Sequence, residues 1–175
     1  MKKSTLIGLI FIGGAIGFYF FSYWNKGGFN STTIEIRGET NIELIGLEYN
    51  GPVKNPKFGS YFDEVEDAIE DKKTAGHVCA YFYSSPGSEN NLPIKAFVGA
   101  HLKDKSVLLR DSFERRGFKV GRTLHGEQDA NLMVASIYDD LREYAQENDI
   151  RLDSNIVLEQ YVSDNKMIVD IPILE

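Results

Sequence analysis

Glu159 and Tyr161 stand two residues apart in a run, Ile156 to Val162, that is otherwise rich in strand-forming residues. Because side chains alternate across a strand, Val157, Glu159 and Tyr161 share one face. A carboxylate on such a face is either exposed to water at the rim or is the polar group of a pocket, since a buried carboxylate needs a partner. In a pocket, Glu159 could bind a cation or serve as a general base.

Composition limits the classes of function. The chain has 175 residues, of which 42% are hydrophobic and 12% aromatic, which suits one domain with a core and an appendage. The net charge of −7 argues against a nucleic-acid surface, which needs clustered Lys and Arg. The single cysteine, Cys79, cannot form an internal disulfide, and the three histidines lack the short spacing of a metal site. We therefore expect no metal, no cofactor and no nucleic-acid partner.

The N-terminal segment predicts a membrane anchor. Lys2 and Lys3 precede an uncharged run, Leu6 to Trp24, that is just long enough for a hydrocarbon core of about 30 Å. A cleavable signal peptide is the rival interpretation, but the aromatic residues at 20–24 better suit the boundary between lipid and water. The positive-inside bias favours a cytoplasmic N-terminus and a soluble domain outside the cytoplasm.

This interpretation divides the chain into four parts. Residues 1–4 form the cytoplasmic N-terminus, 5–24 a single-pass transmembrane helix, 25–31 a flexible tether, and 32–175 the folded domain. In that domain, β-branched and alternating runs predict strands at 32–37, 41–49, 77–83, 94–102, 117–124, 155–162 and 166–174. Three- and four-residue apolar spacing predicts helices near 58–69, in a helical region ended by Gly76, and at 131–148. Gly51-Pro52 is expected to stop the strand at 41–49, and Lys103 to Arg116 suits a connecting segment with a short helix.

The order strand, helix, strand, strand occurs twice, which indicates an internal repeat. Residues 60–65 align with 136–141, and 78–83 align with 156–161. This alignment makes Tyr81 the counterpart of Glu159 and Tyr83 the counterpart of Tyr161. We predict an α+β fold in which two units, related by a pseudo-twofold axis, form an antiparallel sheet with a central groove between them. Ligand sites often form in grooves of this kind.

The part of the chain after the anchor, roughly residues 41–174, resembles the GyrI-like small-molecule-binding domain, also called the AraC effector-binding domain. The likeness rests on the following segments: Tyr49-x-Gly51-Pro52, Tyr81-Phe82-Tyr83-Ser84-Ser85-Pro86, the helix at 131–148, and Glu159-x-Tyr161 followed by Ile171-Pro172-Ile173. The segment Gly117-Phe118-Lys119-Val120 and the N-terminal span also resemble a membrane-anchored branch that includes a testis-expressed ER-phagy receptor. That receptor's long acidic tail is absent here, so a role in autophagy is not expected.

The resemblance implies that the acid of the Glu-x-Tyr strand contacts lipophilic cations among aromatic rings. That role falls on Glu159, with Tyr161, Tyr81, Tyr83 and Tyr49 as walls. The leading hypothesis is a membrane-tethered module that senses or sequesters an amphipathic, cationic small molecule. One alternative is hydrolysis of reactive electrophiles, with Glu159 as the catalytic acid or base. Another is a protein-interaction scaffold whose groove holds no small ligand.

Overall fold

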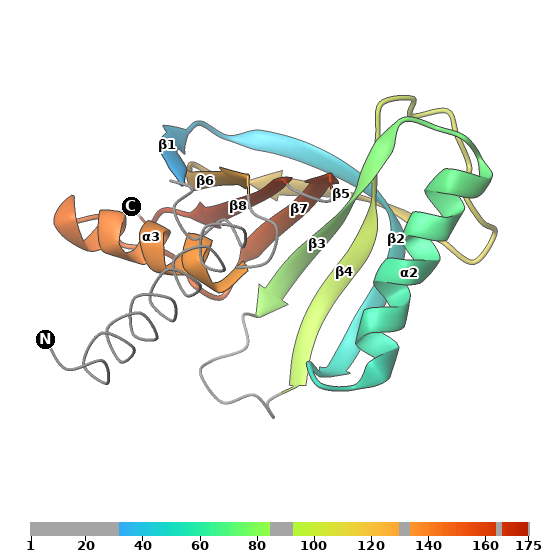
Figure 1. Cartoon of the computed structure of the whole chain (residues 1–175), viewed down its shortest axis with the longest axis horizontal. Coiled ribbons are helices and arrows are strands. Elements are labelled where there is room, and N and C mark those ends of the chain that lie inside the picture. Colours follow the sequence, from blue (N-terminus) through green and yellow to red (C-terminus); the bar gives the residue numbers. More distant parts are fainter. Residues whose placement is uncertain (1–31, 85–92, 130–133, 164–165, 175) are drawn as a thin grey trace, which may run out of the picture.

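The computed structural model describes residues 32–84, 93–129, 134–163 and 166–174 (Figure 1). These residues form one antiparallel sheet of eight strands with two helices, an α+β fold as expected. The strands are β1 (Thr33–Arg37), β2 (Thr40–Pro52), β3 (Gly76–Ser84), β4 (Pro93–Leu102), β5 (Glu114–Val120), β6 (Thr123–Asp129), β7 (Val157–Ser163) and β8 (Lys166–Pro172), and the helices are α2 (Pro56–Asp71) and α3 (Val134–Glu147).

The strand–helix–strand–strand order occurs twice, as β2-α2-β3-β4 and as β6-α3-β7-β8. In the sheet the strands lie in the order β1-β6-β8-β7-β3-β4-β2-β5, so the two units meet where β7 pairs with β3. Figure 1 shows β3 and β7 between the two helices. The topology therefore places the third element of one unit, β3, beside the third element of the other, β7. The pseudo-twofold relation between the units stays a prediction.

Helix α2 begins where Asn55 and Pro56 provide a start signal. The Asn55 side chain accepts a hydrogen bond from the backbone N–H of Lys57 at 3.0 Å, and proline suits the first helical position. Val65 and Ala68 are buried on the side of α2 that packs against the sheet. The helix ends at Asp71, five residues before Gly76, which instead opens β3. Lys73, with φ of 49°, makes the turn after the helix.

Helix α3 packs against β6 and β8 through an apolar stripe. Ile137, Leu141 and Ala145 are buried, and their spacing of four residues places them on one side of the helix. Gly126 of β6 lies under Leu141, and a Cβ at that glycine would meet the Leu141 side chain at 3.1 Å. The glycine therefore lets the helix approach the sheet closely. The 131–133 part of the predicted helix lies outside the described residues.

The two faces of the sheet carry different cores. The helix-covered face includes Ala80, Phe82 and Val157, which pack in one cluster with residues of α3. The opposite face carries a second cluster that contains Cys79, Tyr81, Phe97, Phe118 and Leu158, with others. Because neighbouring residues of a strand point to opposite faces, each strand contributes to both clusters.

A paired glycine contact lets β2 and β4 approach closely. Gly46 of β2 lies opposite Gly99 of β4, and a Cβ at Gly46 would overlap the backbone carbonyl of Val98. Larger residues at this pair would push the two strands apart. The contact lies on the face opposite the helices, beside the residues of the second cluster.

Three boundaries differ from those expected. The predicted strand at 117–124 is two strands, β5 and β6, because the chain turns at Gly121 and Arg122 between them. Strand β2 continues through Gly51 and Pro52, where a stop was expected, because it is still paired with β4 there. No helix occurs between Lys103 and Phe113, although one was expected in the segment that connects β4 to β5.

The predicted membrane anchor at 5–24 and the tether at 25–31 lie outside the described residues. Among the residues that the structure does describe, neither helix is long and apolar enough to cross a bilayer.

Candidate ligand-binding site

Glu159 lies at the centre of β7, between β3 and β8, with 7% of its surface exposed. Its cross-strand neighbours are Ala80 on one side and Val169 on the other. Both neighbours are completely buried apolar residues. A carboxylate in such surroundings is costly unless hydrogen bonds replace its lost water. The structure thus selects the buried alternative for Glu159 and rejects the exposed rim position.

Two phenols supply those hydrogen bonds. Tyr138 of α3 donates to Oε1 of Glu159, and Tyr161 of β7 donates to Oε2 at 2.5 Å. Both carboxylate oxygens therefore accept a hydrogen bond from a side chain. One donor comes from a helix and the other from the same strand, so the site joins α3 to the sheet.

The burial of the group changes its protonation chemistry. Burial raises the pKa of the Glu159 carboxyl above its ordinary value, although the hydrogen bonds from Tyr138 and Tyr161 act in the lowering direction. Burial and the neighbouring carboxylate also raise the pKa of both phenols far above the ordinary range. The phenols therefore stay protonated near neutral pH, so they are hydrogen-bond donors and not bases.

A cavity of about 380 Å³ opens next to Glu159, and we name it the Glu159 cavity. Its other lining residues come from both helices, from the two central strands and from the segment before α2: Val53, Phe58, Phe82, Tyr138, Arg142 and Val157. Most of this lining is apolar or aromatic. Arg142 is the cation among these residues, and its guanidinium is paired with Asp139 at 2.8 Å. The cavity can therefore surround an apolar body and present one carboxylate to it.

A second cavity of about 430 Å³, which we name the α2 cavity, lies between α2 and the ends of β3 and β7. Phe62, Ile69, Val78 and Tyr161 are among its lining residues. The rings of Phe62 and Tyr161 meet edge to face with centroids 5.6 Å apart. Tyr161 thus takes part in both places, because its ring lines the α2 cavity while its hydroxyl binds Glu159.

The structure brings some of the sequence-predicted residues together and separates others. Tyr161 contacts Glu159 directly. Tyr49 lies on the same side of the sheet but is only 3% exposed, and its hydroxyl donates to the carbonyl of Pro52 at 2.7 Å. The Tyr49 ring packs against Phe58 with centroids 4.8 Å apart, so it supports a cavity wall from behind.

Tyr81 and Tyr83 are not brought to Glu159. The register of β3 and β7 places Ala80 beside Glu159 and Tyr81 beside Leu158, and paired residues share a face. Tyr81 therefore points to the opposite face, where it stacks on Phe118 with centroids 4.4 Å apart. The Tyr83 ring lies edge to face with Tyr81, at 5.4 Å. A repeat alignment that equates Tyr81 with Glu159 is one residue out of step, and such a slip exchanges the two faces.

Tyr138 is a site residue that the sequence reasoning missed. It follows Ile137, the first residue of the inward stripe of α3, and so lies at the edge of the helix face that packs on the sheet. A buried carboxylate needs a hydrogen-bond donor, and a tyrosine at the edge of the buried face of a helix can supply one. This was the feature of the sequence that could have pointed to Tyr138. The sequence could not predict that Tyr138 pairs with Glu159, because the position of α3 on the sheet depends on tertiary packing.

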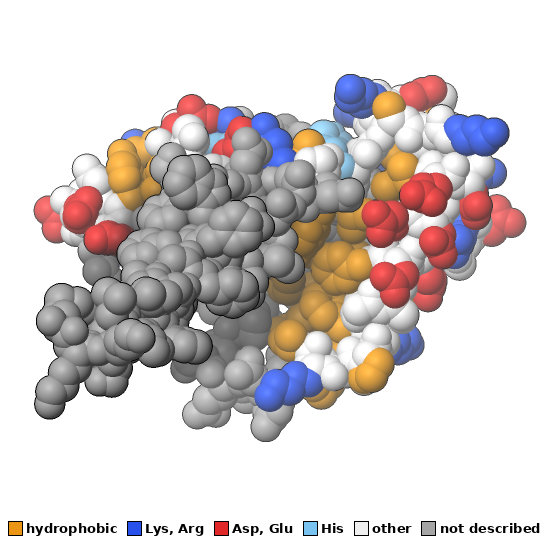
Figure 2. Space-filling model, in the orientation of Figure 1, with side chains coloured by type: hydrophobic (Ala, Val, Ile, Leu, Met, Phe, Trp, Pro, Cys, Tyr) orange, Lys and Arg blue, Asp and Glu red, His pale blue; other side chains and the backbone are white. Residues whose placement is uncertain are grey.

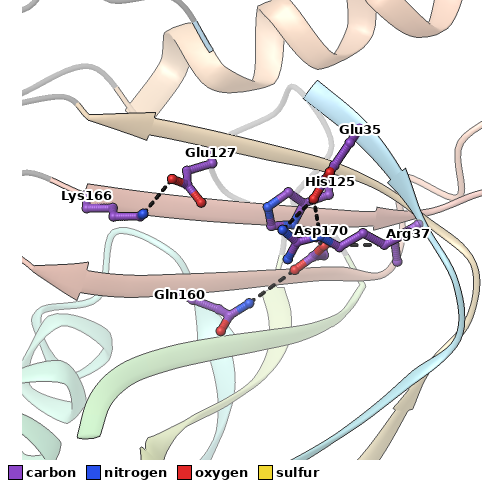
Figure 3. Close-up of polar contacts among 8 residues, drawn as sticks. Glu35, Arg37, His125, Glu127, Gln160, Lys166 and Asp170 are labelled. Atoms are coloured by element: carbon purple, nitrogen blue, oxygen red, sulfur yellow. Dashed lines mark hydrogen bonds and ion pairs between the residues drawn. The ribbon is translucent and has the colours of Figure 1, made fainter. Parts of the chain in front are cut away.

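A separate polar cluster lies on the face opposite the helices (Figure 3). Asp170 of β8 is its centre, and its carboxylate accepts hydrogen bonds from Thr123 at 3.3 Å, from the Nδ1 of His125 at 2.8 Å and from Gln160 at 3.2 Å. His125 is 1% exposed, and its Nε2 has no hydrogen-bond partner among the described residues. The cluster joins β6, β8 and β7, and neither cavity is lined by it. It is a structural network of the sheet interior.

Comparison with known proteins gives a fold but no family by sequence. No family model and no curated protein matches the chain. An uncharacterised conserved protein from Listeria innocua has a TM-score of 0.57 and 11% identity, over 82% of this chain and 92% of that one. A protein described as a hydrolase from the same organism has a TM-score of 0.53 and 10% identity over the same shares.

An integron cassette protein from the mobile metagenome of Vibrio cholerae has a TM-score of 0.52 and 14% identity, over 82% of this chain and 95% of that one. At these identities the likeness establishes architecture and not activity. Membership of the membrane-anchored branch stays a prediction. The likeness supports the α+β architecture of eight strands and two helices, and membership of the GyrI-like family stays a prediction as well.

Proposed function

We propose that this domain binds an amphipathic, cationic small molecule in the Glu159 cavity. The observation that supports this most directly is a carboxylate, 7% exposed, that lies next to an apolar cavity and accepts hydrogen bonds from two phenols. A buried carboxylate of this kind is ionised most easily when a positive charge enters beside it. A ligand that carries a positive charge on an apolar body would match both the Glu159 carboxylate and the apolar residues of the lining.

The size and lining of the cavity agree with such a ligand. Its volume of about 380 Å³ falls within the ~300–1,000 Å³ common for small-molecule sites. Phe58, Phe82 and Tyr138 present aromatic rings, and an aromatic face contributes roughly 0.5–2 kcal/mol to the binding of a cation. The described lining residues leave this space open, which disfavours a groove filled by its own side chains.

The surroundings also favour positive ligands. Figure 2 shows acidic side chains over the outer surface of α2, beside a hollow lined with hydrophobic side chains. The helix carries Asp63, Glu64, Glu66, Asp67 and Glu70. A surface of one sign raises the local concentration of ions of the other sign and speeds their association. The net charge of −7 for the whole chain acts in the same direction.

A matched pair of probes tests the proposal. Phenyltrimethylammonium and its neutral carbon isostere, tert-butylbenzene, have nearly the same shape and differ in charge. We expect calorimetry on residues 32–175 to show binding of the cation, weaker binding of the isostere, and loss of this preference in Glu159→Gln. Equal affinity of Glu159→Gln and the parent domain for the cation would remove Glu159 from the role.

Hydrolysis in the same cavity is the second candidate function. It is favoured by a carboxyl of raised pKa, which could serve as a general acid or base, held beside two phenols that could donate hydrogen bonds to a reacting oxygen. One protein of similar fold is described as a hydrolase. Turnover of an electrophilic substrate that disappears in Glu159→Gln would support this candidate. Saturable binding without turnover supports the binding module.

Membrane tethering through residues 5–24 is the remaining part of the proposal. It rests on the uncharged run from Leu6 to Trp24. The full chain should stay with membranes after extraction at alkaline pH, whereas a chain that starts at Thr32 should be released. Protease protection of the domain in sealed vesicles reports the predicted orientation.

A further inference from the structure

The two cavities follow one another along α2 and the central strands, and we call the line through both of them the trough. Phe58 of α2 lines the Glu159 cavity, and Phe62 and Ile69 farther along the same helix line the α2 cavity. Strand β7 follows the same order, since Glu159 belongs to the first cavity and Tyr161 to the second. A helix and a strand therefore run beside both spaces in the same direction, which makes the two spaces neighbours along a common line.

A single aromatic contact divides the trough. Phe62 and Tyr161 meet across it edge to face, with centroids 5.6 Å apart. Phe62 also meets Phe58 edge to face, at 5.3 Å. An apolar chain that crosses this contact would therefore pass over three aromatic rings. Such a surface suits a hydrocarbon linker better than a polar one.

The α2 cavity has its own negative charge. Glu66 and Glu70 line it, and their spacing of four residues places both on the same side of α2. None of the described residues that line this cavity is Lys or Arg. Phe62, Ile69 and Val78 make much of the remaining lining apolar. Charge complementarity therefore predicts a second cation at this end of the trough.

We propose that the natural ligand class is an elongated amphiphile with a cationic group at each end. One group lies at Glu159, the other lies at Glu66 and Glu70, and an apolar linker crosses the Phe62–Tyr161 contact. This inference rests on the proposed function, because it assumes that Glu159 receives a cation. The helix rises about 18 Å from Phe58 to Glu70 at ~1.5 Å per residue, which sets the scale of the linker.

Two probes of equal chain length test this assignment. Decamethonium carries a trimethylammonium group at each end of a ten-carbon chain, and decyltrimethylammonium carries one. Calorimetry at fixed ionic strength and below micelle formation gives both affinities. We expect decamethonium to bind about fivefold more tightly, the size expected for ion pairs with exposed carboxylates.

Variants of α2 show whether the second cation binds at Glu66 and Glu70 or is attracted by the total negative charge of the helix. Glu66→Gln with Glu70→Gln should abolish the preference for decamethonium and leave decyltrimethylammonium binding nearly unchanged. The matched control is Asp63→Asn with Asp67→Asn, which removes the same charge from exposed positions of the same helix that line neither cavity. The control should keep the preference.

The failures are distinguishable. If both probes bind equally and Glu159→Gln weakens both, the two-cation inference is wrong while the proposed function stands. If Glu66→Gln with Glu70→Gln and the control variant lose the preference for decamethonium equally, the second cation interacts with the total negative charge of the helix and not with a local site. That result would overturn the inference. If neither probe binds the parent domain, both the inference and the proposed function fail.

Discussion

The hydroxyl of Tyr138 on α3 donates a hydrogen bond to the Glu159 carboxylate on β7. This contact joins a helix of the second unit to the strand at which the two units meet. Tyr138 also lines the Glu159 cavity, so the side chain that holds the carboxylate forms part of the cavity wall. The contact makes α3, which packs against β6 and β8 (Figure 1), part of the candidate site.

Tyr138→Phe should destabilise the domain. The change removes one donor from a buried carboxylate and keeps the ring, so the expected loss in the free energy of unfolding is about 1–3 kcal/mol. Urea denaturation followed by circular dichroism measures it. Tyr144→Phe on the same helix, whose hydroxyl takes no part in the Glu159 cluster, is the control and should change stability by less than about 0.5 kcal/mol. Equal losses in the two variants would contradict a special role for Tyr138.

The stability of the unliganded domain should depend on the ionisation of Glu159. The folded state raises the pKa of this carboxyl above its ordinary value of 4.5. The contribution that this raised pKa makes to the free energy of unfolding is therefore fully present below pH 4.5. It is lost as the pH rises through the folded-state pKa, by at most about 1.4 kcal/mol per pH unit. Unfolding curves of the parent and of Glu159→Gln across this range should diverge, with the parent losing more. Parallel curves would show that the pKa is not raised.

Cation binding should release protons at pH values near and below the folded-state pKa of Glu159. A bound cation stabilises the ionised form of Glu159, so its affinity should rise as pH increases through the folded-state pKa of this group. Calorimetry of phenyltrimethylammonium in two buffers of different ionisation enthalpy reports the number of protons released. Glu159→Gln, which has no titrating group at this position, should release none. Proton release that persists in the variant would assign the linkage to another group.

The aromatic residues of the two faces should differ in their effect on binding. Phe58→Leu removes a ring from the lining of the Glu159 cavity and should weaken phenyltrimethylammonium binding about two- to fivefold. Tyr83→Leu removes a ring from the other face, where it lies beside Tyr81, and should leave the affinity unchanged. The reverse ranking would restore Tyr83 as a wall residue and would contradict the register described for β3 and β7.

Asp170→Asn should lower the free energy of unfolding more than most changes in the sheet. The Asp170 carboxylate accepts from Thr123, His125 and Gln160 in a buried setting, so the expected loss is about 1–3 kcal/mol. Glu127→Gln is the control, because Glu127 is paired with Lys166 at a position where its side chain is 34% exposed, and exposed pairs contribute about 1 kcal/mol or less. Chemical denaturation ranks the two. A smaller loss in Asp170→Asn would show that the cluster is dispensable.

Periodicity and resemblance predicted the parts of the fold that depend on local patterns. The apolar spacing of α2 and the alternation around Glu159 both match the structure, because each reflects burial of one face. The division into β5 and β6 was missed, since Gly121 and Arg122 interrupt an apparently continuous run. The face of Tyr81 was also missed, because it depends on the register between β3 and β7, which no single strand encodes. For the same reason Tyr138 could not be paired with Glu159 from the sequence.

Strand β7 carries two independent chemistries on alternate residues. Glu159 and Tyr161 serve the trough, while Leu158 packs in the core of the opposite face and Gln160 binds Asp170. The two sets of side chains therefore lie on opposite faces of the sheet. If the proposed function holds, a library at the exposed lining residues Glu66 and Glu70 of α2 should change ligand preference while the hydrogen bonds of Glu159 stay intact. Side-chain alternation along β7 thus keeps the candidate site physically separate from the packing of the opposite face.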